Sequence, residues 1–346
     1  MAASKPTNTK SQVTLEDELI KQDEITLQKD QLWFGYPLHF YQGFWCLNMI
    51  SEIAISFQNN FQAQDTDVIL ASLPKTGTTW LKSLLFSVVN RKKYCDVSQH
   101  PLHSITPHEL IDHLEFEVYK NCHGNDLPDL TKIPLPRLFG THMPYSTLPE
   151  SIKTSKCRII YVSRNPLDNF VSLCHFWSKF DLNKGMKLDV NIMEEHLDKY
   201  CKGIFPFGPY EDHLLGYWKE SMQNSNKVLF LEYEGLKKEP KDHLKRLAEF
   251  VGCPFSREEE KGNVIDEIIE LCSIKSLKEM EVNKSGKYYP WFENKALFRK
   301  GEVGDWTNYL TPLMAKRINE MQERLKEAGF CFTYYHNLRA MDSSVA

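Results

Sequence analysis

Short apolar segments alternate along this chain with longer stretches in which apolar residues recur at helical spacing. The apolar segments have strand length, are rich in β-branched and aromatic residues, and occupy positions 67–73, 137–142, 157–163 and 227–233. Helical spacing is clearest at Leu244, Leu247, Ala248 and Val251, and again at Ile265, Ile268, Ile269 and Cys272. Strands that alternate with helices predict an α/β fold, a single domain with a central parallel sheet flanked by helices.

Three regions depart from this alternation. Residues 1–30 are polar and charged, which predicts a mobile N-terminal arm. Residues 33–61 are rich in aromatic side chains, which we expect to pack onto the body of the fold as core in preference to forming a ligand wall. Residues 286–300 show no clear periodicity, so we expect a long loop there, of the kind that is often functional.

The turn after the first apolar segment carries the clearest chemical signal. Its sequence, Pro-Lys-Thr-Gly at 74–77, leads directly into an amphipathic helical run over 78–90. Backbone N–H groups at the start of a helix, threonine hydroxyls and one lysine would converge there, which predicts a P-loop-like phosphate site. It is not a Walker A motif, because Lys75 precedes the only glycine, Gly77, and the loop is shorter. An ordinary strand–helix turn with a surface lysine is the alternative.

Polar residues also follow the other three apolar segments. The second ends in Thr141-His142, the third is followed by Arg164 and then by a helix that carries Ser172, and the fourth ends in Tyr233. Because ligands bind at the carboxyl ends of parallel strands, we expect these side chains to share one crevice with Lys75. The alternatives are a structural histidine, a surface arginine ion pair and a serine on the surface of a helix.

A second cationic segment lies near the C-terminus. Arg299 and Lys300 are adjacent in the glycine-flanked stretch 298–306, and an arginine offers bidentate geometry to an anion. Together with Arg164 and Ser172, this segment is suited to hold a separate phosphate. Two anion sites imply a nucleotide that is phosphorylated at two places.

The composition narrows the class of protein and its partners. A chain of 346 residues is within reach of one large α/β domain, and a formal net charge of −4 argues against non-specific binding to nucleic acid. Nine cysteines at irregular spacing, without a CxxC pair, are typical of reduced thiols, so we expect a cytoplasmic location. The start of the sequence lacks the apolar region of a signal peptide, and no apolar run approaches membrane-spanning length, so we expect no membrane partner.

Taken together, these motifs resemble the cytosolic sulfotransferases, which use the sulfate donor 3′-phosphoadenosine 5′-phosphosulfate (PAPS). The resemblance covers roughly residues 32–332, and its motifs lie at 74–80, 141–142, 161–166 with Ser172, and 299–306. The segments that look plant-like are 41–45, 207–209, 281–284 and 292–294. Among plant members, 298–306 and 43–46 look most like the hydroxyjasmonate sulfotransferases, with flavonol, brassinosteroid and desulfoglucosinolate enzymes as close competitors.

The resemblance implies a role for each candidate residue. The 5′-phosphosulfate would be held by Lys75, Thr76, Gly77, Thr78 and Thr79. Adenine would contact Trp80 and Tyr233. The 3′-phosphate would bind Arg164, Ser172, Arg299, Lys300 and Gly301, and His142 would be the catalytic base. It also implies PAPS as cosubstrate, PAP as product, no metal, a small hydroxylated acceptor, and a sulfotransferase domain at 31–332 in a monomer or homodimer.

Four positions or segments depart from the family pattern. Gly140 stands where animal relatives carry a second lysine, so Lys75 would be the main cation near the leaving group. Ile274 replaces an aromatic residue that would face adenine, and His113 replaces an aromatic residue of the acceptor pocket. His113 either fills that space or provides a polar contact for an acidic acceptor. The tail at 333–346 has no recognisable counterpart.

Two other classes of function compete with this interpretation. A metal-dependent nucleotide kinase would need a longer phosphate loop and a strand-end aspartate for Mg²⁺, and the sequence shows neither near Lys75. A catalytically silent nucleotide-binding module would have no need of both Lys75 and His142. The sequence therefore favours in-line sulfuryl transfer, which requires positioning, a base and charge stabilisation.

Overall fold

Four parallel strands form the centre of the molecule in the computed structural model, which describes residues 31–120, 122, 127–180, 188–289 and 292–334. The strands are β4 (Val68–Ser72), β5 (Leu138–Thr141), β6 (Arg158–Ser163) and β7 (Val228–Glu232). Their order in the sheet is β5-β4-β6-β7, and all neighbouring pairs are parallel. Each strand lies inside one of the four apolar segments, so the predicted parallel sheet is confirmed.

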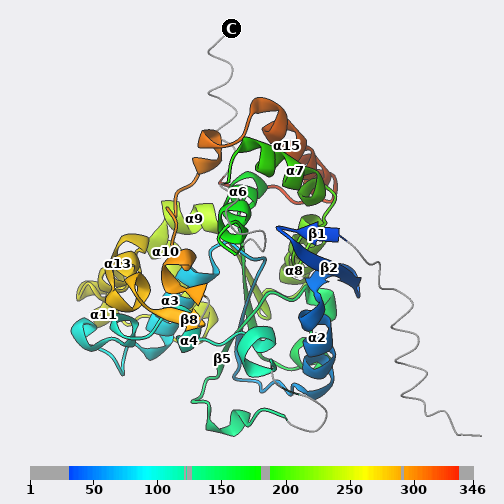
Figure 1. Ribbon diagram of the computed structural model, residues 1–346. Coiled ribbons are helices and arrows are strands. Elements are labelled where there is room, and N and C mark those ends of the chain that lie inside the picture. Colours follow the sequence, from blue (N-terminus) through cyan, green and yellow to red (C-terminus); the bar gives the residue numbers. More distant parts are fainter. Residues whose placement is uncertain (1–30, 121, 123–126, 181–187, 290–291, 335–346) are drawn as a thin grey trace, which may run out of the picture.

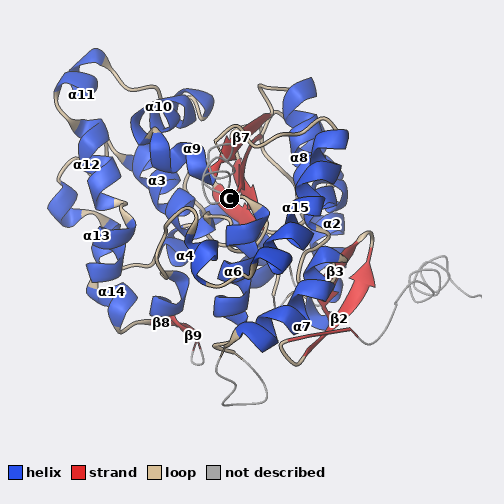
Figure 2. Ribbon diagram, turned by 90° about the horizontal axis from the view of Figure 1, so that it is seen from above, coloured by secondary structure: helices blue, strands red, loops and turns tan. Residues whose placement is uncertain are grey.

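Helices cover both faces of this sheet. They are α2 (Asn48–Asn60), α3 (Thr78–Asn90), α4 (Pro107–Leu110), α5 (Glu150–Thr154), α6 (Pro166–Trp177), α7 (Val190–Cys201), α8 (Tyr210–Gln223), α9 (Tyr233–Lys238), α10 (Pro240–Phe250), α11 (Arg257–Lys261), α12 (Val264–Leu271), α13 (Ile274–Glu279), α14 (Glu281–Lys284) and α15 (Pro312–Glu327). Short 3₁₀ helices lie at Val97–Gln99, Pro101–His103, Leu130–Lys132, Tyr145–Thr147, Asn294–Leu297 and Asp305–Asn308, and one π-helical turn lies at Leu114–Val118. In Figures 1 and 2, α3 and α10–α13 lie on one side of the sheet, and α2, α7, α8 and α15 lie on the other.

The two faces of the sheet support separate hydrophobic cores because successive side chains of a strand point in opposite directions. In β4 and β6, Ile69 and Ile159 belong to the core under α2, α8 and α15. Leu70 and Ile160 belong to the core under α3, α10 and α12. The two predicted helical patterns, at 244–251 and 265–272, correspond to α10 and α12 and pack into this second core.

An antiparallel sheet formed by β1 (Gln31–Trp33), β2 (Tyr36–Tyr41) and β3 (Phe44–Leu47) lies beside α2. Trp33, Phe44 and Trp45 are buried in the first core, so the interpretation of this aromatic region as core is confirmed. The backbone N–H of Trp45 donates to the carbonyl of Gly208 at 2.8 Å, and that of Phe207 donates to the carbonyl of Trp45. These bonds fix the turn that carries Phe207.

The expectation of an unstructured loop over 286–300 is wrong in part. The strands β8 (Lys287–Tyr289) and β9 (Phe292–Glu293) form a short antiparallel pair, followed by the 3₁₀ helix at Asn294–Leu297. Strands of this length are too short to show a period, and the segment depends on distant contacts. One of these is the hydroxyl of Tyr289, which donates to Glu117 Oε1 at 2.7 Å.

The chain ends lie largely outside the described residues, which include neither the predicted arm at 1–30 nor positions 335–346 of the predicted tail. The first two tail residues are described. The N–H of Thr333 donates to the carboxylate of Glu232, at the end of β7. Within the described ranges, no helix combines the length and apolar character needed to cross a membrane.

Candidate active site

The predicted anion loop connects β4 to α3 through two residues in the left-handed region. Lys75 has φ 69° and Gly77 has φ 118°. A Cβ atom at Gly77 would lie 2.7 Å from Cδ2 of Tyr233, so only glycine lets the turn approach that ring. Gly77 is the N-cap of α3 and no side chain caps this end within the described chain. The first N–H groups of α3 therefore remain available to an anion.

The three threonines of the loop are held in different ways. The hydroxyl of Thr76 donates to the carbonyl of Leu73 at 2.7 Å and lies 3.0 Å from that of Val162, so it fastens the loop to β6. Oγ1 of Thr78 lies 2.7 Å from Oγ of Ser72. Thr79 faces another element, with Oγ1 2.9 Å from Nε2 of His108. The loop is thus anchored to the end of β4, to β6 and to α4.

Lys75 is the cation of this loop. Its Nζ lies 4.4 Å from the centre of the Phe176 ring, a cation–π contact. Burial, followed by the like charges of Lys179, Arg164 and Arg299, lowers the pKa of Lys75 to about 7. A bound anion would relieve this repulsion, so the site is electrostatically suited to a phosphate or phosphosulfate group.

His142 lies directly after β5 and is bound to the end of β4. Its Nδ1 is 2.6 Å from the carbonyl oxygen of Ser72 and 3.3 Å from the Ser72 hydroxyl. Because a carbonyl only accepts hydrogen bonds, Nδ1 carries the proton and Nε2 keeps its lone pair in the neutral ring. Burial, followed by the neighbouring His113, moves the pKa of His142 well below its usual range. The ring is therefore neutral at neutral pH and can accept a proton at Nε2.

The backbone of His142 is fixed by two buried side chains. Its N–H donates to Oε1 of Glu115 at 2.5 Å, and its carbonyl accepts from Nε2 of His213 at 2.9 Å. Tyr161 Oη lies 3.0 Å from Nδ1 of the same His213. Burial raises the pKa of Glu115 to about 7. Glu115 belongs to the π-helical turn, a local irregularity of the kind that is frequent at functional sites.

The second cationic segment meets the carboxyl end of β6. Arg164 Nη2 donates to the carbonyl of Glu302 at 2.7 Å, and the guanidinium lies 4.6 Å from the centre of the Tyr233 ring. Arg299 and Lys300 both pair with the buried carboxylate of Asp305. The Nε atoms of Arg164 and Arg299 are buried and lack a hydrogen-bond partner within the described part of the chain. Buried donors of this kind normally have a partner, and two guanidinium groups fit an anion.

Tyr233 links the two anion regions. Its ring packs against Gly77 and meets the Trp80 ring edge-on at 5.5 Å, and its hydroxyl donates to the carbonyl of Gly301 at 2.9 Å. Gly301 in turn contacts Ile274, because a Cβ atom at this glycine would lie 2.7 Å from Cγ1 of Ile274. The family departure at Ile274 therefore lies next to the aromatic pair. Ser172 is buried on α6.

Several residues that organise this region have no motif of their own. The carboxylate of Asp168, on α6, accepts from the N–H groups of Gly304 at 2.8 Å and Trp306 at 3.1 Å, and so fastens the cationic segment to the helix. Ser72 and Glu115 position His142 as described above. A buried acid in the first turn of a helix is a signal that sequence reasoning could have used for Asp168, since acids favour that position.

At Gly140, where animal relatives carry a lysine, the structure leaves no room for a side chain. A Cβ atom there would lie 2.9 Å from Cε of Lys82 and 3.0 Å from Cδ2 of His113. Lys82 enters from α3 and is fully buried. A lysine from α3 thus lies in the region that Gly140, on β5, leaves open. In the described ranges, no group of three or more His, Cys, Asp or Glu side chains is arranged to hold a metal ion.

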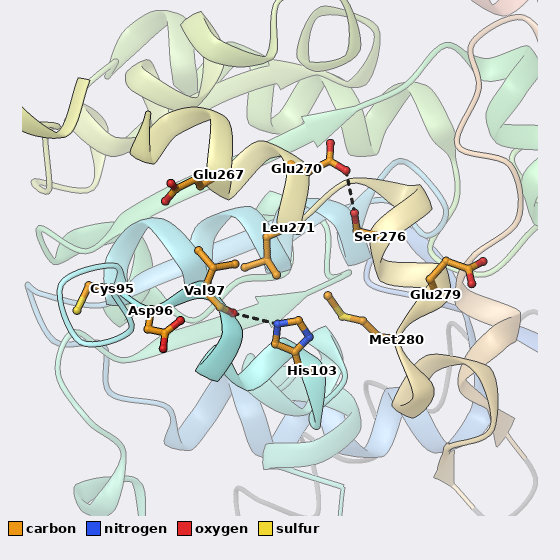
Figure 3. Close-up of a pocket in the computed structure, with 10 residues that line it drawn as sticks. All are labelled: Cys95, Asp96, Val97, His103, Glu267, Glu270, Leu271, Ser276, Glu279 and Met280. Carbon is orange, nitrogen blue, oxygen red and sulfur yellow. Dashed lines mark hydrogen bonds between the residues drawn. The ribbon is translucent and has the colours of Figure 1, made fainter. Parts of the chain in front are cut away.

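One pocket of the molecule lies outside this site. Figure 3 shows a pocket lined by Glu270, Ser276, Met280 and His103, beneath α12 and α13. Among the described residues that line it, none is a predicted site residue. The chemistry predicted from the sequence lies instead at the carboxyl edge of the sheet. An anion loop and a neutral imidazole at that edge are typical of an enzyme that transfers a group from a nucleotide donor.

Comparison with known proteins identifies which group is transferred. Residues 65–329 match the family model described as the sulfotransferase domain. Cytosolic sulfotransferase 6 of Arabidopsis thaliana is 45% identical over 323 residues, which cover 91% of this chain and 96% of the relative. Cytosolic sulfotransferase 5 of the same plant is 44% identical over 310 residues, covering 89% and 94%.

Solved structures agree with the sequence matches. A crystal structure of an Arabidopsis thaliana sulphotransferase has a TM-score of 0.69 and 34% identity, over 94% of this chain and all of that chain. A mouse sulfotransferase in complex with PAP has a TM-score of 0.60 and 28% identity, over 84% and 95%. The chain belongs to the sulfotransferase family, among the plant cytosolic members, and is a PAPS-dependent sulfotransferase.

Proposed function

We propose that this protein transfers the sulfuryl group of PAPS to a hydroxyl of a small plant metabolite, with His142 as the base. The observation that supports this most directly is the tautomer of His142. Its Nδ1–H is held by the Ser72 carbonyl at 2.6 Å, which leaves the Nε2 lone pair for the acceptor. The cytosolic names of its relatives support a cytosolic location. We expect the protein to act as a monomer or homodimer.

Different residues bind the different parts of the donor nucleotide. Lys75, Thr78, Thr79 and the backbone of Thr76 and Gly77 hold the 5′-phosphosulfate. Trp80 and Tyr233 contact adenine, and Arg164, Ser172, Arg299, Lys300 and Gly301 hold the 3′-phosphate. The unpaired Nε atoms of the two arginines support the last assignment.

The reaction is an in-line displacement at sulfur. His142 Nε2 takes the proton of the acceptor hydroxyl while that oxygen forms its bond to sulfur. The bond between sulfur and the bridging oxygen breaks, and its electron pair stays on the 5′-phosphate of the departing PAP. Lys75, in its charged form, stabilises the charge that develops on that oxygen. No step of this scheme needs a metal.

For the acceptor, a hydroxyjasmonate-like molecule is favoured, on the likeness of residues 43–46 and 298–306 to enzymes of that specificity. Flavonol, brassinosteroid and desulfoglucosinolate acceptors are the alternatives. The test is transfer of labelled sulfate from PAPS to each acceptor, with EDTA present throughout. We expect turnover of at least one acceptor in EDTA. A requirement for Mg²⁺, or for ATP in place of PAPS, would overturn the proposal.

A further inference from the structure

A buried lysine lies beside the catalytic histidine and contacts two other imidazoles. Lys82 Nζ is 2.6 Å from the carbonyl of Ile111, 2.9 Å from Nδ1 of His113 and 3.4 Å from Nδ1 of His108. An ammonium group has three N–H donors and no acceptor, so each contact is a donation from Lys82. The proposed sulfuryl transfer uses none of these three side chains.

Lys82 thereby sets the tautomer of both rings. Since each Nδ1 accepts from the ammonium, the proton of each neutral ring is on Nε2. Burial, as the leading cause for each ring, keeps the pKa of His108 and of His113 well below the usual range, so both rings are neutral. Glu117 Oε2 also lies near Nδ1 of His113, at 3.6 Å, which is too long for a hydrogen bond.

The two Nε2–H groups differ in what they meet. That of His108 donates to Thr79 Oγ1 at 2.9 Å. His113 is only 2% exposed, and its Nε2 has no hydrogen-bond partner anywhere in residues 31–120, 122, 127–180, 188–289 and 292–334. Buried donors are normally paired, so an unpaired one whose tautomer is fixed is placed to receive a ligand atom or a water.

His113 is adjacent to the reacting position. The centres of the His113 and His142 rings are 4.6 Å apart, and Phe116 lies 5.6 Å from the first and 6.0 Å from the second. Two rings whose centres are this close can both be reached by neighbouring oxygens of one small molecule. Gly140 makes this arrangement possible, because any side chain there would collide with Lys82 and His113.

We propose that His113, held as its Nε2–H tautomer by Lys82, donates a hydrogen bond to an acceptor oxygen next to the hydroxyl that is sulfated. The enzyme therefore selects acceptors whose hydroxyl is flanked by a carbonyl, carboxylate or second hydroxyl oxygen. Among the candidate acceptors, this favours the flavonols and brassinosteroids over hydroxyjasmonate, whose side-chain hydroxyl has no neighbouring oxygen. His113 is a specificity residue and Lys82 a positioning residue. The inference rests on the proposed function, because it takes His142 as the base.

The first test compares two small probes that differ in one group. Catechol has a second oxygen beside its hydroxyl, and 2-methylphenol has a methyl group in the same place. We expect wild-type enzyme to prefer catechol about tenfold in kcat/KM, the value of one hydrogen bond. If a probe is not turned over, we compare instead the constants with which the two probes inhibit sulfation of the best acceptor. Equal values for the two probes, including no binding by either, would overturn the proposal.

Two variants show whether His113 causes this preference. His113→Phe keeps the ring and loses the donor, so the preference for catechol should disappear. His113→Gln returns an amide N–H near the position of Nε2, so part of the preference should return. His103→Phe, the same change at a histidine of the pocket in Figure 3, is the matched control and should keep the full preference. If His113→Phe instead lowers kcat/KM equally for both probes, the ring of His113 supports the fold or contacts the sulfuryl group and does not select the acceptor.

A second test needs neither acceptor nor PAPS. Nitrogen NMR of ¹⁵N-histidine-labelled protein reports which ring nitrogen carries the proton. We expect His113 to be protonated at Nε2 alone at pH 7, and the Lys82→Met substitution to change that signal. Protonation at Nδ1, or at both nitrogens, would overturn the proposal whatever the activity. An intact Nε2–H tautomer without PAPS-dependent transfer to any acceptor would instead count against the proposed function alone.

Discussion

The nucleotide side and the acceptor side of the candidate site differ in their charge. The proposed nucleotide side consists of cationic side chains, those of Lys75, Arg164, Arg299 and Lys300. The acceptor side presents neutral rings, and the buried ammonium of Lys82 donates to two of them. These rings belong to His108, His113, His142, Phe116 and Phe207. Burial lowers the pKa of Lys75 to about 7 on one side, and keeps the imidazoles uncharged on the other.

This difference shows what each side contributes. Cations that repel one another are stabilised by an anion, so in the proposed function the nucleotide side supplies binding energy and orientation. Neutral imidazoles can accept or donate a proton without first losing one to solvent, so in the proposed function the acceptor side supplies the base and the directed hydrogen bonds. Substitutions on the two sides should therefore separate affinity from turnover.

The largest effect is expected on the acceptor side. His142→Ala should lower the rate of sulfuryl transfer by about 10²–10⁴-fold, the usual contribution of a general base. The dissociation constant of PAP, measured by calorimetry, should stay close to the wild-type value, because the nucleotide side is untouched. His103→Ala, outside the site, serves as the control. Near wild-type turnover in a correctly folded His142→Ala would mean that another group removes the proton.

On the nucleotide side, Arg164→Ala and Arg299→Ala should each weaken binding of PAPS roughly ten- to a hundredfold, since a charge-assisted hydrogen bond contributes about 1.5–3 kcal/mol. Adenosine 5′-phosphosulfate lacks the 3′-phosphate and should lose far less affinity. A fluorescence titration that measures the dissociation constants of both donors tests this difference. Equal losses for the two donors would show that the arginines support the fold or the 5′ site.

These two predictions come from motifs that are visible in the sequence. The fold could be predicted from the sequence equally well. Each strand of the parallel sheet is a buried apolar run, and a buried run of strand length is visible without knowing its neighbours. The loop at 74–77 is contiguous, so its chemistry could be recognised before its geometry was known. The predicted site residues at the strand ends follow from the rule that parallel strands end at one edge.

The acceptor side was harder to predict because its parts are distant in sequence. The position of His142 depends on its hydrogen bonds to Ser72 and Glu115. Lys82 contacts histidines that are about thirty positions away in the sequence. No local pattern marks a lysine on a helix as fully buried, since lysine is usually exposed. The hairpin of β8 and β9 was missed for a related reason, because its strands are too short to show a period.

A smaller effect should appear in the pH dependence of donor binding. With a pKa of about 7 in the free protein, Lys75 is charged below pH 7 and loses its proton above it. An anion favours the charged form, so affinity should fall as the pH rises. Relative to Lys75→Arg, which stays charged, wild-type affinity for PAPS should fall roughly tenfold between pH 6 and pH 8. A constant ratio across this range would mean that Lys75 does not contact the donor.

The smallest effect is expected from the contact that joins the cationic segment to the body of the fold. Asp168→Asn keeps an oxygen for one of the two N–H groups, of Gly304 or of Trp306, but replaces the other oxygen by an amide NH2 and removes the charge that strengthens both bonds. A loss of about 1 kcal/mol in ordering this segment corresponds to roughly fivefold weaker binding of PAPS. Adenosine 5′-phosphosulfate should bind as it does to wild type, and turnover at saturating PAPS should be unchanged. A lower rate at saturation would contradict the separation of the two sides, because it would show that the segment also positions the acceptor or the base.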